Sequence, residues 1–133
     1  MLCSKSQRYK DMSPHDLGVE GEKIAANFLK SRGLEILKRN WVCPCGEADI
    51  IAREGDVHVL VEVKTRLMDQ ICTPPYPELA VNSAKRRKYQ DIARCYLANA
   101  DADSIRFDIV AITISDGGIV HVRHIVSAFG SDA

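Results

Sequence analysis

The sequence lacks the features that would direct it to a membrane or, through overall charge, to a polyanion. Its 18 basic and 18 acidic side chains give a formal net charge of zero, so any binding to nucleic acid has to come from local clusters of charge. Aromatic residues make up only 6% of the chain, and it contains no apolar run long enough to cross a bilayer. We therefore expect no contact with a membrane.

Cysteine use also excludes a disulfide-stabilised secreted domain. The chain has five cysteines, an odd number, and no secretory signal precedes them, which predicts a cytoplasmic protein with free thiols. Cys43-Pro44-Cys45 resembles part of a zinc site, yet the remaining cysteines and histidines lack zinc-ligand spacing. We favour a loop that leads from the segment ending at Trp41 into a strand beginning at Glu47.

A chain of 133 residues is long enough for one domain with its own core. The polar residues 1–14 are expected to be disordered, and residues 15–133 to form a single domain. Apolar periodicity predicts helices and strands in the following ranges: a helix over Leu17–Arg32, capped by Asp16 and ended by Gly33; strands over Leu34–Trp41, Glu47–Arg53 and Val57–Thr65; a helix from Ser83, as its cap, to about Ala98; and strands over Ile105–Ile114 and Ile119–Val126. This order, α-β-β-β-α-β-β, predicts an α/β fold with a mixed β-sheet flanked by helices.

The second and third strands carry the most informative pattern. Gly55-Asp56 is typical of a two-residue type II′ hairpin turn, which pairs Asp49 with Glu62 and places Glu47 opposite Lys64. Valines alternate along the third strand and match a row of Ala48, Ile50 and Ala52 on the second, whereas a slip of one residue would put charged side chains beside valines. The charged side chains are therefore expected on one face of the hairpin.

Two carboxylates directly opposite each other repel unless a cation lies between them. Mg²⁺ or Mn²⁺ suits such a position, because these ions take carboxylate and carbonyl oxygens and keep several waters. The predicted ligands are Asp49, Glu62 and the carbonyl of Val63. The alternative is an ordinary amphipathic strand in which Glu47 and Lys64 form a cross-strand ion pair.

Two further groups of charged residues could serve this site. Glu22 lies at the margin of the apolar stripe of the first helix, from which its carboxylate could reach the metal. Lys85, Arg86 and Arg87 lie near the start of the second helix, where positive charge opposes the helix dipole. Their position favours an anionic partner, and a solvated helix face is the alternative.

Several motifs together resemble a known family over residues 17–129. They are Gly21-Glu22, Gly46-Glu47-Ala48-Asp49-Ile50-Ile51, Val61-Glu62-Val63-Lys64-Thr65-Arg66, Lys85, Tyr96-Leu97 and Arg106-Phe107-Asp108-Ile109-Val110. The family is the YraN-like family of endonuclease-like proteins in the PD-(D/E)XK nuclease superfamily. The resemblance implies a restriction-endonuclease-like core, with Asp49, Glu62 and Lys64 as the catalytic set.

The related archaeal Holliday junction resolvases use a glutamate of the first helix at the metal site, which implies the same role for Glu22. Family members often have Gly-Gly-Glu where this chain has Cys45-Gly46-Glu47, a change that leaves the acidic pair intact. Because neighbouring carboxylates hold the proton on Lys64, we expect this residue to orient the nucleophile rather than act as a general base.

The expected function is Mg²⁺- or Mn²⁺-dependent endonuclease cleavage of DNA, with branched or junction DNA among the substrates. Lys85, Arg86, Arg87 and Arg66 would contact backbone phosphates with little base specificity, and a two-fold substrate such as a junction would favour a homodimer. One alternative is a non-catalytic nucleic-acid-binding module on a nuclease fold. Another is a structural protein with surface ion pairs.

Overall fold

The computed structural model describes residues 8–68, 83–102, 104–115 and 117–128. Within these ranges, two long helices and five strands follow one another along the chain. They are α2 (Pro14–Ser31), β1 (Glu35–Cys43), β2 (Gly46–Glu54), β3 (Val57–Leu67), α3 (Ser83–Asn99), β4 (Ile105–Ile114) and β5 (Val120–Ile125). The predicted order of helices and strands is confirmed. Neither long helix combines the length and the apolar character needed to span a membrane.

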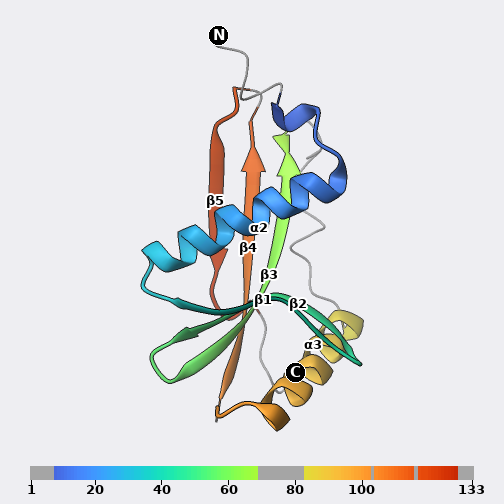
Figure 1. Ribbon diagram of the computed structural model, residues 1–133, viewed down its shortest axis with the longest axis vertical. Helices are drawn as coiled ribbons and strands as arrows, with labels where there is room; N and C mark the ends of the chain where they lie inside the picture. The colour runs from blue at the N-terminus through green and yellow to red at the C-terminus, as the bar shows by residue number, and fades with distance from the viewer. Residues whose placement is uncertain (1–7, 69–82, 103, 116, 129–133) are drawn as a thin grey trace.

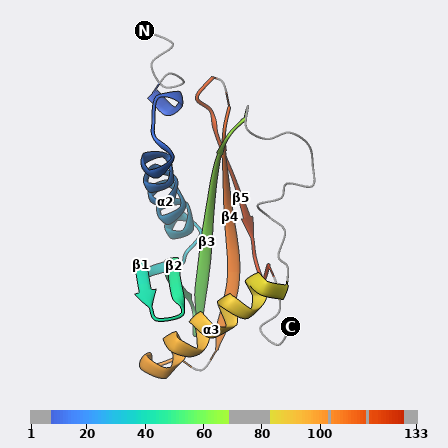
Figure 2. The same cartoon turned by 90° about the vertical axis from the view of Figure 1, so that its right-hand side faces the viewer.

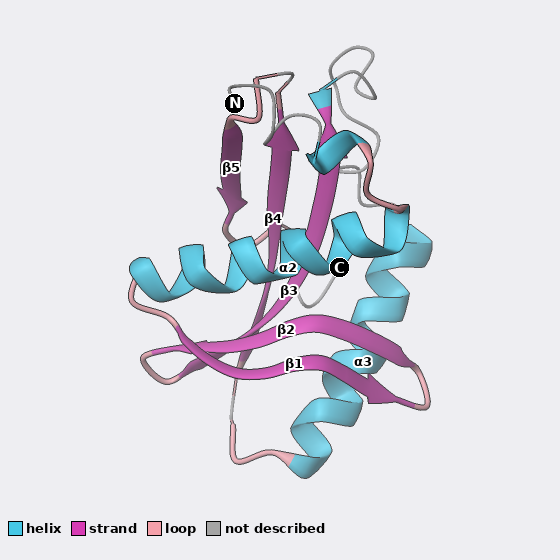
Figure 3. Cartoon of the chain, turned by 45° about the horizontal axis from the view of Figure 1, so that its top comes forward, coloured by secondary structure: helices cyan, strands magenta, loops and turns pink. Residues whose placement is uncertain are grey.

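The five strands form one mixed sheet in the order β1-β2-β3-β4-β5. Pairing is antiparallel between β1 and β2, β2 and β3, and β4 and β5, whereas β3 and β4 run parallel. Parallel strands need a long connection between them, and α3 lies within it. Figures 1 and 3 show that the β1–β2 hairpin lies across the direction of β4 and β5.

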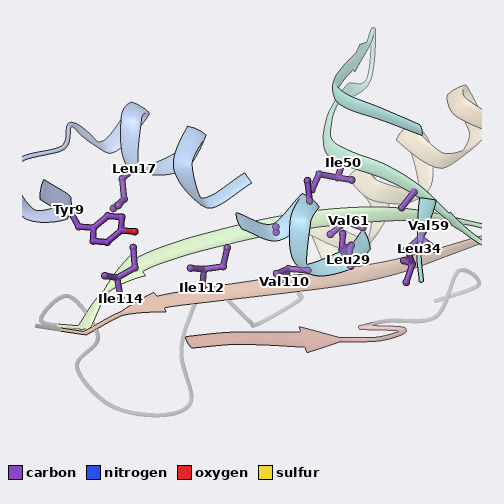
Figure 4. Close-up of a cluster of buried hydrophobic side chains, with 13 residues drawn as sticks. Tyr9, Leu17, Leu29, Leu34, Ile50, Val59, Val61, Val110, Ile112 and Ile114 are labelled. Atoms are coloured by element: carbon purple, nitrogen blue, oxygen red, sulfur yellow. The ribbon is translucent and has the colours of Figure 1, made fainter. Parts of the chain in front are cut away.

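The two helices cover opposite faces of the sheet, and each face has its own buried cluster (Figure 2). Alternation along the strands assigns side chains to the two faces. The α2-side cluster, shown in Figure 4, includes Leu17, Leu29, Ile50, Val59, Val61, Val110 and Ile112. The α3-side cluster includes Ile51, Leu60, Ile92, Ala93, Tyr96 and Phe107. The predicted row of valines on one face of the hairpin is thus confirmed: Val59 and Val61 lie in the α2-side cluster, and Val57 and Val63 pack against it.

The ends of α2 differ in part from the prediction. Ser13, rather than Asp16, is the N-cap, because its hydroxyl accepts a 3.1 Å hydrogen bond from the Asp16 N–H. At the other end Gly33 has a φ of 93°, and its N–H and that of Leu34 donate to the Lys30 and Leu29 carbonyls. This is a Schellman motif, so the prediction that Gly33 ends the helix is confirmed.

The sequence pattern placed the start of the domain at residue 15. In the structure, residues before this position also pack against the core. Tyr9 is buried in the α2-side cluster, and Met12 packs against it. Arg8 forms an ion pair with Glu20 on α2. Part of the segment expected to be disordered is therefore in contact with the core, while residues 1–7 lie outside the described residues.

The β2–β3 hairpin has the predicted turn and register. Gly55 has a φ of 61°, as the first central residue of a type II′ turn requires. Pairing runs from Glu54–Val57 to Ile50–Val61, which is the register that pairs apolar residues with valines. It stops there, so Asp49 and Glu62 do not form the directly opposed pair that the sequence predicted.

Ala48 departs from the predicted row because it lies in the α3-side cluster, whereas Ile50 and Ala52 lie in the α2-side cluster. Asn40 on β1 lies between the pairs Arg39–Ile50 and Trp41–Ala48 and has a left-handed backbone, with a φ of 52°. A residue in this conformation interrupts the regular pleat. Alternation along β2 therefore changes near Asp49, and the prediction for Ala48 is wrong.

Candidate active site

The site begins where β2 leaves the ladder it forms with β3. The last pair is Ile50–Val61, and two residues further along β3 the Val63 N–H donates a 2.8 Å hydrogen bond to Asp49 Oδ2. A carboxylate oxygen has thus replaced a backbone carbonyl as the partner of this N–H. Because the N–H and C=O of one strand residue point to the same side, the Val63 carbonyl faces the strand that carries Asp49.

Glu62 and Lys64 lie on β3 on either side of Val63, and their side chains form an ion pair with 3.1 Å between Glu62 Oε1 and Lys64 Nζ. Both side chains are partly exposed, at 18% for Glu62 and 28% for Lys64. Lys64 therefore pairs with Glu62 on the same strand. An ordinary amphipathic hairpin was expected to pair Lys64 with Glu47 on β2 instead.

Asp49 lies in an environment unfavourable to its charge. Burial raises the pKa of Asp49, and the carboxylates of Glu62 and Glu47 raise it further, against the lowering effects of the Val63 N–H and Lys64. The carboxyl groups of Glu62 and Glu47 are therefore each close enough to Asp49 to disfavour its charge. A divalent cation would relieve this repulsion.

Glu22 comes to the same place from α2. Burial raises the pKa of Glu22, and Asp49 is the next largest cause, while Arg39 and a hydrogen bond from the Asn40 side chain act in the opposite direction. The structure thus brings Glu22 near Asp49, as its position on the helix margin predicted. The left-handed residue that changes the pleat of β1 is also the one that hydrogen-bonds Glu22.

A close approach of α2 to β3 makes this possible. A β-carbon built on Gly21 would overlap the hydroxyl of Thr65 and would lie 2.9 Å from its Cβ, a distance that real side chains do not reach. Only glycine therefore allows the helix backbone to lie so near β3. Glu22 follows directly in the sequence, so the contact between Gly21 and Thr65 sets its height above the sheet.

A cavity of about 150 Å³ lies between the strands and α3. Its walls include Glu47, Asp49, Glu62, Lys88, Tyr89 and Phe107. Asp49 and Glu62 thus border one cavity although they are not a ladder pair. A cation held between them would be in contact with this space.

Tyr89 on α3 contributes a group that the sequence pattern did not indicate. Its hydroxyl hydrogen-bonds Glu62, and burial, followed by this hydrogen bond, raises the pKa of Tyr89 far above its ordinary value. The hydroxyl therefore keeps its proton throughout the physiological range and donates to the Glu62 carboxylate. The apolar helical stripe predicted only that Tyr89 faces inward, and its partner on β3 is distant in sequence.

The predicted phosphate-binding residues lie around the site rather than in it. Lys85 and Arg86 are partly exposed on the first turns of α3, Arg87 is exposed beside them, and Arg66 is exposed near the end of β3. In the described part of the chain, the basic residue that lines the cavity is Lys88. It belongs to the same run of positive charge but lies one residue beyond the predicted set.

The oxygen ligands at this site suit a hard divalent cation that keeps several of its waters. They do not form a site in which the protein supplies every ligand. Within residues 8–68, 83–102, 104–115 and 117–128, no three Asp, Glu, His or Cys side chains are arranged to hold a metal ion. Mg²⁺ needs no such cage, since one or two carboxylates and several waters complete its coordination. Asp49, Glu62 and the Val63 carbonyl supply ligands of that kind.

A second charged group lies behind the site and was not predicted. Asp108 on β4 has a fully buried side chain and accepts hydrogen bonds of 2.8–3.0 Å. The donors are Arg106 Nε and Nη2, His124 Nε2 and the Ser127 N–H. Burial alone would raise the pKa of Asp108, but these hydrogen bonds, led by those from Arg106, lower it overall. Arg106 also bonds Glu54 at the β2–β3 turn, so the network ties β4 and β5 to the hairpin.

The fold and the site together define an α/β protein that gathers carboxylates from α2, β2 and β3 at one end of a β-hairpin. A family model described as "Uncharacterised protein family UPF0102" matches residues 21–112, a span that contains Glu22, Asp49, Glu62 and Lys64. The chain belongs to the UPF0102 family. Its resemblance to YraN-like proteins is thereby confirmed at the level of the family.

Three relatives from different bacteria match this chain over most of their own length. The chain is 44% identical over 116 residues to a UPF0102 protein of Geotalea uraniireducens, a match that covers 85% of this chain and 88% of the relative. It is 40% identical over 114 residues to a UPF0102 protein of Thermodesulfovibrio yellowstonii, covering 85% and 97%. A UPF0102 protein of Beutenbergia cavernae is 38% identical over 111 residues, covering 82% and 92%.

Proposed function

We propose that this protein is a nuclease of the PD-(D/E)XK type, which hydrolyses phosphodiester bonds of DNA with Mg²⁺ or Mn²⁺. The observation that carries the proposal is the gathering of Glu22, Asp49 and Glu62 around one strand junction, with Lys64 paired to Glu62. Partly buried carboxylates that repel one another reduce stability in the absence of a cation. Such an arrangement is typical of a metal-dependent active site.

Asp49, Glu62 and the Val63 carbonyl would hold the metal, and Glu22 would add a carboxylate from the α2 side. When bound, the metal supplies Lewis-acid polarisation of a phosphoryl oxygen and lowers the pKa of a coordinated water. Lys64, which forms an ion pair with Glu62, would position the attacking water and stabilise negative charge that develops on the phosphate. Tyr89 orients Glu62 by donating a hydrogen bond to it.

The basic residues of α3 would bind the DNA backbone beside the cavity. Lys88 borders the carboxylates, and the exposed Arg87 lies one residue earlier on the same helix. Contacts with phosphates give affinity that falls with salt and depends little on base sequence. Recognition by the shape of the DNA is therefore expected, which agrees with a preference for branched or junction substrates.

The decisive experiment compares purified variants on linear, flapped and four-way DNA with Mn²⁺ or Mg²⁺. Asp49→Ala and Glu62→Ala should lower cleavage at least about 100-fold while DNA binding stays nearly unchanged. Glu35→Gln is a matched control, because Glu35 is an exposed carboxylate that pairs with Arg53 on the surface of the hairpin. This control should cleave like the wild type.

Equal cleavage by the wild type and both alanine variants would reject the site. Metal-independent DNA binding without cleavage by the wild type would instead support the alternative of a non-catalytic nucleic-acid-binding module. Calorimetric titration separates the two cases further, because only the active-site proposal requires Mn²⁺ binding that disappears in Asp49→Ala.

A further inference from the structure

The sheet extends beyond the helix that covers its α3 side. Figures 1 and 2 show α3 at one end of the sheet, with β3, β4 and β5 continuing past it. In this part of the sheet, Val63, Ile112 and Val122 belong to or pack against the α2-side cluster. Because side chains alternate along a strand, the residues between them point to the α3 side. We call this surface the open face, and it consists of Lys64, Arg66, Ala111, Thr113, His121 and Arg123.

Strand pairing arranges the open face as two rows across β3, β4 and β5. The rows are Lys64–Ala111–Arg123 and Arg66–Thr113–His121. Small side chains therefore occupy the middle strand, and basic ones occupy the strands on both sides of it. Neighbouring strands lie about 4.8 Å apart, so the backbones of the two basic strands are separated by about 10 Å. The open face is thus a shallow channel along β4 with positive charge on both of its sides.

No negative charge within these strands compensates the open face. Apart from Glu62, the described residues 62–67, 109–114 and 120–125 include no acidic residue. Arg66, His121 and Arg123 are exposed, and Arg123 makes no ion pair with the part of the chain that the structure describes. Since the whole chain has a net charge of zero, this concentration of positive charge is local. A surface of this kind attracts an anionic polymer.

The open face begins at the candidate active site. Glu62 pairs with Ile109 in the row that precedes the Lys64 row, and both residues border the cavity. Two residues along β3 correspond to about 6.7 Å, and the Glu62 and Lys64 side chains are in contact, at 3.1 Å. A polymer that lies at the carboxylates can therefore continue onto the open face without a break.

We propose that the open face binds the sugar-phosphate backbone of one DNA strand where that strand leaves the carboxylate site. Arg123 and His121 would contact phosphates from β5, and Arg66 would contact them from β3. The identity of the partner rests on the proposed function, whereas the place of the surface rests on strand pairing and exposure. The six residues include no Phe, Tyr or Trp on which a base could stack, so the contacts are with the backbone and carry little base preference.

The experiment measures binding of a fluorescein-labelled single-stranded oligonucleotide by fluorescence anisotropy, in EDTA and between about 50 and 200 mM salt. Arg123→Gln should weaken binding about 5-fold and reduce the slope of log K against log salt concentration by about 0.7, the loss of one phosphate contact. Lys23→Gln is the matched control. It also removes one exposed positive charge, but from α2 on the opposite face of the sheet, and it should leave both quantities unchanged.

Two further substitutions at the same position separate charge from shape. Arg123→Lys keeps the positive charge and should bind DNA like the wild type, whereas Arg123→Glu should weaken binding more than Arg123→Gln does. All three Arg123 variants should unfold within about 2 °C of the wild type, because the side chain is exposed. Equal binding by Arg123→Gln and Lys23→Gln would overturn the proposal, and so would a wild-type protein that binds no DNA in this buffer.

The binding assay contains no divalent metal and measures no cleavage, so its failure is distinguishable from a failure of the proposed nuclease function. Cleavage that requires Asp49, together with DNA binding that is insensitive to Arg123→Gln, would reject the open face alone. DNA binding that falls in Arg123→Gln, together with no cleavage by the wild type, would reject the nuclease proposal and leave the open face in place.

Discussion

The Val63 N–H donates to Asp49 Oδ2 over 2.8 Å at the position where β2 leaves the sheet. The hydrogen bond satisfies a backbone donor that would otherwise lose its ladder partner. It also holds the Asp49 carboxylate beside Glu62 and Glu47 despite their repulsion. One interaction thus ends the ladder and gathers negative charge, which links the stability of the protein to its proposed metal site.

Asp49→Asn should stabilise the metal-free protein at pH 7 by about 1 kcal/mol, because the amide oxygen can still accept from Val63 while the buried charge is lost. The pKa of Asp49 is raised in the folded state. The folded state therefore holds this proton more tightly, and the Asp49 contribution to stability falls as pH rises from the ordinary aspartate range through the folded pKa. Urea unfolding at pH 7 and at pH 3 measures the effect.

The gain from Asp49→Asn should nearly vanish at pH 3, where the wild-type carboxyl is protonated in both states. Mg²⁺ or Mn²⁺ should stabilise the wild type but not the variant. The opposite result, an Asp49→Asn variant less stable than the wild type at pH 7 without metal, would contradict this prediction. It would show that the hydrogen bond from the Val63 N–H and the surrounding charges stabilise the Asp49 carboxylate.

Gly21→Ala should destabilise the protein by about 2 kcal/mol, since the added methyl group must displace Thr65 or move α2 away from β3. Moving α2 would also move Glu22 away from Asp49. Gly18→Ala is the matched control, because a β-carbon there meets no atom within 4 Å. This control should stabilise the helix by about 0.5–1 kcal/mol.

Thermal and urea unfolding of the two glycine variants, measured side by side, test the close approach directly. Equal stabilities for Gly21→Ala and Gly18→Ala would mean that α2 does not lie against Thr65 as described. The comparison is independent of any activity, and it tests the element that positions Glu22.

The sequence predicted the parts of this fold that depend on local pattern. Alternating valines and Gly55-Asp56 determine the hairpin register, because one face must be apolar and the turn must be short. The gathering of Asp49, Glu62 and Lys64 follows from that register. The register does not determine where the β2–β3 ladder ends. That point depends on the twist of β1 and β2, and the sequence pattern did not predict the left-handed backbone of Asn40.

Contacts between distant segments could not be predicted from pattern. Tyr89 fits an inward helical stripe whether or not it meets Glu62. Asp108 lies within an apolar run that predicts only a buried strand. A buried aspartate needs hydrogen-bond donors or cations around it. The sequence pattern does not show that these are Arg106 and His124, because His124 comes next to Asp108 only through the pairing of β4 with β5.

Asp108→Asn should lower the free energy of unfolding by about 3 kcal/mol at pH 7, because the guanidinium of Arg106 loses a buried anionic partner. The pKa of Asp108 is lowered in the folded state. Its stabilising contribution is therefore present above the ordinary aspartate pKa of about 3.9 and is lost as pH falls through the folded value. The difference from the wild type should shrink in urea unfolding below that pH.

Asp91→Asn serves as the control for Asp108→Asn. Asp91 forms an ion pair with Arg94 on the surface of α3, where both side chains are largely exposed. Such a pair contributes less than about 0.5 kcal/mol. If the two substitutions cost the same, the Asp108 network contributes no more than a surface ion pair.

Tyr89→Phe tests whether α3 takes part in the proposed metal site. The substitution removes the hydrogen bond to Glu62 and should weaken Mn²⁺ binding about 10-fold, since partners that orient a metal ligand contribute to affinity. Tyr96→Phe is the matched control. Tyr96 lies on the same helix as Tyr89, and its hydroxyl forms a 2.5 Å hydrogen bond with His58 on β3.

Both tyrosine variants should lose about 1 kcal/mol of stability, but only Tyr89→Phe should change the dissociation constant for Mn²⁺ in calorimetry. Under the proposed function, Tyr89→Phe should also need more Mn²⁺ for half-maximal DNA cleavage. Equal Mn²⁺ affinity in the two variants would assign Tyr89 to the core alone, because its hydroxyl would then orient no ligand of the metal.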